Sequence, residues 1–154
     1  MADTAIHDEV ETWIREKWLQ PRFGREFTKK NARLKSGGEF EFDAVSEDGK
    51  VVANISTSSL KTASGNRGSG KINKVRSDIY FLLLAEIAEK RMLVLTESDM
   101  YEAWLKQIDR GRVPDSIQIR CVEIPGPLRE KLEAAQKNAS EEVTPPWNRD
   151  SASI

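Results

Sequence analysis

Two spacings of apolar residues alternate along the chain, and each spacing predicts a different kind of element. The first apolar stripe recurs every three or four residues, which is typical of a helix with one buried face. It consists of Ile6, Val10, Trp13, Ile14 and Trp18. We expect this helix to end at Gln20, because the residue before a proline, here Pro21, is disfavoured in the helical conformation.

Three strands are expected next, in the ranges 25–34, 39–45 and 51–56. The second has the clearest pattern, since acidic and apolar residues alternate with a period of two from Glu39 to Val45. Asp48-Gly49 predicts a hairpin turn between the second strand and the third. The later elements are expected to be a basic loop rich in Ser and Gly, a helix, an apolar strand, a helix, a strand and a last helix, in the ranges 57–70, 71–90, 92–95, 98–108, 116–124 and 127–137.

The order of elements is therefore α-β-β-β-α-β-α-β-α. This order predicts an α/β fold with a mixed central sheet and helices on both faces. We expect a single domain over residues 1–137, with Cys121 in its core because it alternates with Ile117 and Ile119. Residues 138–154 have no periodicity and contain two prolines, so a disordered tail that includes Trp147 is expected there.

Composition narrows the class of protein. No apolar run approaches the ~20 residues that span a bilayer, so no membrane association is expected. The single cysteine and an acidic N-terminus without an apolar leader segment predict a reducing, cytoplasmic location. One His and one Cys are too few for a structural zinc site, which needs about four such ligands.

The net charge of −1 conceals two basic segments. Residues 15–35 contain eight basic and two acidic residues, a local net charge of +6, and residues 57–77 contain five basic residues and no acid. If the two segments meet on one face, they favour an anionic partner such as nucleic acid. A solvated surface of mixed charge is the alternative.

The acid near the end of the second strand, the hairpin and the third strand resemble the core of the PD-(D/E)XK, or restriction-endonuclease-like, nucleases. In that family a carboxylate of the second strand and an E-x-K triplet of the third converge; the acids bind a divalent metal and the lysine assists the attacking water. The resemblance covers residues 6–96. It implies that Asp43 is the aspartate, that Asn54-Ile55-Ser56 is the triplet, and that Mg²⁺ is the cofactor.

The triplet departs from the family's pattern, because Asn54 has no charge and Ser56 cannot replace a lysine. Glu41 lies on the same strand face as Asp43 and is the expected second metal ligand. The same spacing also fits a solvated strand face opposite the core residues Phe40 and Phe42. Further compensating groups are the helix acids Glu9 and Glu11 and the lysines 61, 71 and 74, so the expected catalytic set is Asp43, Asn54, Ser56 and Lys74.

The loop before the helix expected at 71–90 has the pattern G-x-x-x-x-G-K, from Gly65 to Lys71. A nucleotide-hydrolysing loop is disfavoured, because Ile72 stands where that motif needs Ser or Thr for magnesium. A grip on a nucleic-acid phosphate and a flexible linker are the remaining interpretations. The residues expected to bind nucleic acid are Lys61, Arg67, Lys71, Lys74 and Arg76.

The sequence thus predicts a nucleic-acid-binding protein, with DNA as the expected ligand, that could be a divergent metal-dependent phosphodiesterase. The alternative is a non-catalytic accessory or protein-interaction subunit that retains the fold. A homodimer and a protein partner both remain open.

Overall fold

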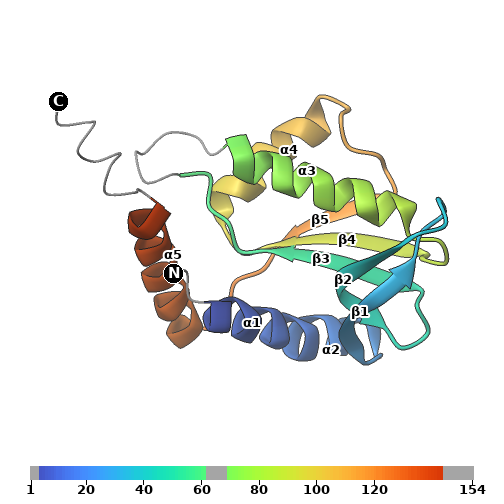
Figure 1. The fold of residues 1–154 in the computed structure, drawn as a ribbon, viewed down its shortest axis with the longest axis horizontal. Coiled ribbons are helices and arrows are strands. Elements are labelled where there is room, and N and C mark those ends of the chain that lie inside the picture. The colour runs from blue at the N-terminus through green and yellow to red at the C-terminus, as the bar shows by residue number, and fades with distance from the viewer. Residues whose placement is uncertain (1–3, 62–68, 144–154) are drawn as a thin grey trace.

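One mixed sheet organises the molecule (Figure 1). The computed structural model describes residues 4–61 and 69–143. The strands are β1 (Phe27–Arg33), β2 (Glu39–Ser46), β3 (Val51–Ser56), β4 (Lys90–Leu95) and β5 (Ile117–Cys121), and they lie side by side in that order. The first three are antiparallel, whereas β3, β4 and β5 are parallel. The predicted α/β class with a mixed sheet is confirmed.

Helices cover both faces of this sheet, as Figure 1 shows. One face packs on a continuous N-terminal helix and on α5 (Gly126–Val143). The N-terminal helix consists of α1 (Thr4–Trp13), a π-helical stretch η1 (Ile14–Leu19) and α2 (Gln20–Phe23). The other face packs on α3 (Ser69–Leu84) and α4 (Ser98–Asp109).

Strand β3 contributes side chains to two hydrophobic cores, one on each face of the sheet. All six of its residues are buried, and alternate residues face opposite layers. Val51, Ala53 and Ile55 pack in the core on the α1 side, and Val52 packs in the core on the α3 side. By the same alternation, the polar pair Asn54 and Ser56 lies on the α3 side, among buried residues.

The register of β1 and β2 shifts by one residue, which creates a bulge beside Asp43. Thr28 pairs with Val45 and Lys30 pairs with Phe42, so Lys29 alone lies opposite both Asp43 and Ala44. A bulge of this kind bends the strand and turns a side chain away from the regular alternation. It explains why Phe42 and Val45 both pack on the α3 side of the sheet.

Two helix ends differ from the sequence-based expectation. The N-terminal helix continues past Pro21 to Phe23, because the proline occupies the first turn of α2, where its missing N–H costs least. It ends at Gly24, whose φ of 63° is left-handed. Helix α3 ends at Leu84 instead of residue 90, since Arg91 donates hydrogen bonds to the free carbonyl groups of Leu82 and Ala85.

Two expectations about the C-terminal third also need correction. Helix α5 runs to Val143 and not to residue 137, because the first helix-breaking pair, Thr144-Pro145, comes only after that point. Residues 144–154, with the expected tail and Trp147, lie outside the described residues. Cys121 is exposed, since β5 ends there and its last two residues leave the core. Among the described residues, no helix is long and apolar enough to cross a membrane.

Candidate functional site

Asp43 lies where β2 and β3 separate. The paired residues of these strands are Ala44 with Ala53 and Val45 with Val52, and the ladder stops before Asp43. Beyond that point, side chains replace the main-chain pairing. The Ile55 N–H donates to Asp43 Oδ2 at 2.8 Å, and the Asp43 N–H donates to Asn54 Oδ1 at 3.4 Å.

Asn54 joins three elements. Its Oδ1 accepts from β2, and its Nδ2 donates to the carbonyl oxygen of Asp78 on α3 at 3.1 Å. Its side chain is buried, so both ends of the amide are satisfied within the protein. Ser56 is also buried, and its hydroxyl oxygen accepts from the Ser58 N–H at 3.3 Å, which fixes the turn after β3. The two polar members of the expected triplet therefore serve as structural braces.

Two acids from opposite helical layers approach Asp43, Glu11 of α1 and Asp78 of α3. The pKa of Glu11 is raised to about 7, chiefly by burial and next by the charge of Asp43. The pKa of Asp78 is likewise raised to about 6, chiefly by burial. Lys74 acts to lower this pKa, and the charge of Asp43 acts to raise it. The pKa of Asp43 is also raised, chiefly by burial, and the Ile55 hydrogen bond and three nearby cations act against this shift.

Those three cations are Lys29, Lys74 and Arg15, in decreasing order of their effect on the pKa of Asp43. Lys74 lies one helical turn before Asp78, with its Nζ 3.4 Å from Asp78 Oδ1. Arg15 donates to the main-chain carbonyl of Asp43 at 2.8 Å and pairs with Glu11 at 3.7 Å. Lysines from both basic segments, Lys29 and Lys74, therefore meet at Asp43.

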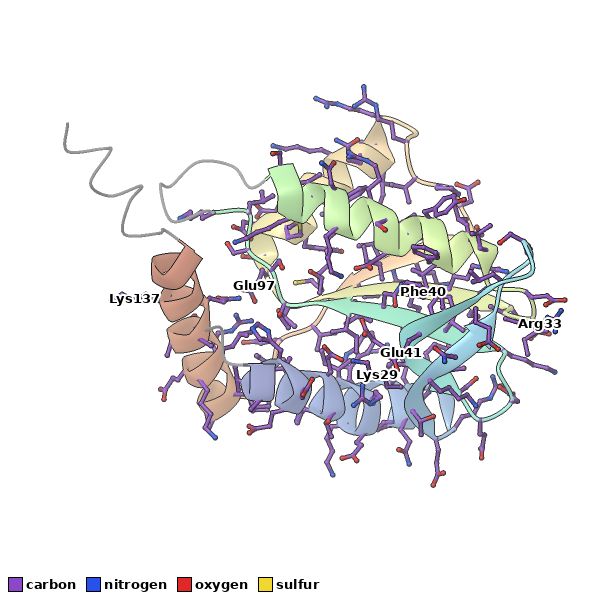
Figure 2. The ribbon with its side chains drawn as sticks, in the orientation of Figure 1. Lys29, Arg33, Phe40, Glu41, Glu97 and Lys137 are labelled. Atoms are coloured by element: carbon purple, nitrogen blue, oxygen red, sulfur yellow. The ribbon has the colours of Figure 1, made fainter. Side chains whose placement is uncertain are left out.

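Glu41, the expected second metal ligand, lies elsewhere on the strand. Its side chain is 58% exposed, and its nearest cation is Lys29, at 4.0 Å. Figure 2 shows Glu41 and Lys29 on the hairpin of β1 and β2, on the side of the sheet that faces α1. This exposed position places Glu41 at the rim of the site.

The residues expected to bind nucleic acid divide into two groups. Lys61 and Lys71 lie together, since Lys71 Nζ donates to the Lys61 carbonyl at 2.8 Å, and Lys71, Lys74 and Asp78 share one side of α3. Arg76 points to another side, where its guanidinium lies 5.7 Å from the ring centre of Trp104 on α4. Arg67 and most of the Gly65–Lys71 loop lie outside the described residues.

The arrangement offers paired carboxylates instead of a complete metal cage. In residues 4–61 and 69–143, no group of three or more His, Cys, Asp or Glu side chains is arranged to hold a metal ion. Mg²⁺ is, however, commonly held by one or two carboxylates, with water and substrate phosphates completing its shell. Asp43, with Glu11 on one side and Asp78 on the other, fits a site of that smaller kind.

Asp78 and Lys29 were not expected at the site from sequence. A signal for Asp78 exists, because it falls within the buried stripe of α3, formed with Val75, Ile79 and Leu82. A charged residue at a buried helical position needs a partner or a function. Lys29 carries no comparable signal, since only the bulge in β2 brings it opposite Asp43.

Comparisons with known proteins identified no similar protein. No protein-family model matches the chain, and neither curated proteins nor solved structures gave a significant match. The class defined by the fold and the site is therefore an α/β protein with a half-buried acidic centre on a mixed sheet.

Proposed function

We propose that the protein binds nucleic acid through a restriction-endonuclease-like core, and that its acidic centre is a divergent, metal-dependent phosphodiesterase site. The observation that carries this proposal is the convergence of three acids from three elements on the point where β2 and β3 separate. The order of strands and helices around that point supports the resemblance drawn from residues 6–96.

The electrostatics support a cation at this centre. Burial is the main cause of the raised pKa values of the three carboxyl groups, and the charge of Asp43 adds to the rise at Glu11 and Asp78. A divalent cation would relieve the repulsion, and when bound it would stabilise phosphoryl charge and activate water. Asp43 and Glu11 or Asp78 would hold it, while Lys74 and the adjoining lysines 61 and 71 would position a phosphate backbone.

A second candidate is a non-catalytic nucleic-acid-binding or accessory subunit. It is favoured by the use of the triplet side chains as braces, since both ends of the Asn54 amide are hydrogen-bonded within the protein and one oxygen of Asp43 already accepts from Ile55. This candidate keeps the fold and the basic surface and needs no cation. Only the first candidate therefore requires a negative charge on Asp43.

The test is cleavage of single- and double-stranded DNA and of RNA, with Mg²⁺ or Mn²⁺, by the protein and by Asp43→Asn. Asparagine keeps an oxygen acceptor for the Ile55 N–H, so the variant removes charge with little change of shape. We expect metal-dependent cleavage by the parent and a loss of at least about 100-fold in the variant, as for removal of one fixed electrostatic group. Salt-sensitive binding without cleavage would replace the first candidate with the second.

A further inference from the structure

The side chain of Lys29 occupies the approach to the acidic centre from β1. Its Nζ lies 3.9 Å from Glu11 Oε1 and 4.0 Å from Glu41 Oε1. Of the cations near the centre, it has the largest effect on the pKa values of both Glu11 and Asp43. The bulge explains this position, because Lys29 alone lies opposite Asp43 and Ala44.

The contacts of the Lys29 ammonium group with Glu11 and Glu41 are weak enough for the group to move away from both carboxylates. Both distances are at the long end for ion pairs, and the side chain is 40% exposed. Pairs of this kind are weak, since water screens the attraction and ordering a long side chain costs entropy. A lysine also has a flexible stem and no fixed direction of donation, so its head can move while β1 stays in place.

We propose that Lys29 is a tethered counter-ion: beside Arg15 it balances the charge of Glu11 in the cation-free protein, is displaced when a divalent cation binds, and then contacts a phosphate of bound nucleic acid. This inference rests on the proposed function, because it assigns a role to the same acidic centre. An ammonium group and a divalent cation cannot both lie against one carboxylate without repulsion, so the two compete. Once displaced, Lys29 stays within reach of a phosphate at the rim, where Glu41 has no other cation within 4 Å among the described residues.

The chain offers a matched control in the next residue. Lys30 is exposed on the same edge strand, but it borders a surface depression lined by Val45, Asp48 and Ile87. Lys30→Met changes the net charge as Lys29→Met does, without touching Glu11. Circular dichroism and thermal unfolding establish that each variant is folded, and Lys29→Gln provides a second substitution if the methionine variant is not.

The first experiment titrates Mn²⁺ alone into the parent, Lys29→Met and Lys30→Met, with binding followed by calorimetry. We expect Lys29→Met to bind Mn²⁺ about tenfold more tightly than Lys30→Met, since a unit charge close to the site is removed. The same result supports the inference even if the parent binds too weakly to measure. Equal affinities in the two variants overturn the inference and leave the proposed function standing. Absence of binding in all three proteins overturns both.

The second experiment measures binding of a short DNA duplex and of single-stranded DNA with Ca²⁺, which occupies oxygen sites. With Ca²⁺ we expect Lys29→Met to bind about three- to tenfold more weakly than Lys30→Met, because one phosphate contact is lost. Without a divalent cation the two variants should bind alike, since Lys29 is then held by Glu11. A difference that is the same with and without Ca²⁺ contradicts the displacement step, and no difference in either condition contradicts the phosphate contact.

Discussion

At Glu11 the free-energy cost of burial falls on the charged form of the carboxyl group. Its side chain is 15% exposed, and its pKa is raised from 4.5 to about 7 in the folded protein. The folded protein therefore binds this proton more tightly than the unfolded chain does. The stability that Glu11 contributes is complete below pH 4.5 and is lost as the pH rises through about 7.

We expect Glu11→Gln to remove most of this decline. Between pH 5 and pH 8 the parent should lose on the order of 2 kcal/mol more of its free energy of unfolding than the variant, because the amide has no charge to bury. Urea denaturation at several pH values gives the comparison, and Glu16→Gln, an exposed site on the same helix, is the control. Parallel pH profiles for the parent and Glu11→Gln would show that burial does not perturb this group.

Asn54 allows a test of the bracing role against the ligand role implied by the family pattern. Asn54→Asp removes the donor to the Asp78 carbonyl and adds a charge beside Asp43 and Asp78. We expect a loss of about 2 kcal/mol in the free energy of unfolding at pH 8, and a smaller loss at pH 5 where the new carboxyl group can be protonated. Urea denaturation at the two pH values measures this loss, and Asn73→Asp, at an exposed position of α3, is the control. A neutral effect would mean that the amide is not a required brace.

At the scale of elements, the end of the N-terminal helix depends on one backbone conformation. Gly24 has a φ of 63° and no atom within 4 Å of a Cβ placed there, so a side chain would cost conformational energy without a clash. We expect Gly24→Ala to lower the free energy of unfolding by about 1 kcal/mol. Gly38→Ala is the matched control, because that site is equally open and its φ is not positive. Equal effects of the two substitutions would remove the conformational explanation.

Elements with one strong pattern were predictable from sequence, whereas details set by neighbouring elements were not. The alternation in β2 and the Asp48-Gly49 turn are local, and both appear where expected, with Gly49 at a φ of 76°. The prediction for the end of α3 was wrong. The last carbonyl groups of this helix accept hydrogen bonds from Arg91, which belongs to β4, and the sequence of the helix does not show such a contact. At the site, Asp43 and Lys74 were accessible from motif and charge, but Lys29 depends on a bulge that strand periodicity does not reveal.

For the whole molecule, charge placement predicts how binding responds to salt. Lys74 pairs with Asp78 of the acidic centre, and Lys71 lies on the same side of α3 with Lys61 beside it. Replacing all three lysines with Ala should therefore weaken binding to any nucleic-acid sequence. The slope of log affinity against log salt should flatten by about two to three units, roughly one per lost phosphate contact. The control replaces Lys106, Arg110 and Arg112 at the end of α4, with the same change in net charge. Equal slopes in the two triple variants would move the binding surface away from the acidic centre.

The central claim is that Glu11, Asp43 and Asp78 form one acidic centre and that Glu41 lies outside it. The most direct measurement is metal-dependent cleavage of nucleic acid by four single variants, Glu11→Gln, Asp43→Asn, Asp78→Asn and Glu41→Gln, beside the parent. We expect Asp43→Asn to lose at least about 100-fold in rate, Glu11→Gln and Asp78→Asn to lose at least about tenfold, and Glu41→Gln to stay within about threefold of the parent. Loss in Glu41→Gln with retention in Glu11→Gln and Asp78→Asn would contradict the account and restore the ligand pair expected from strand spacing.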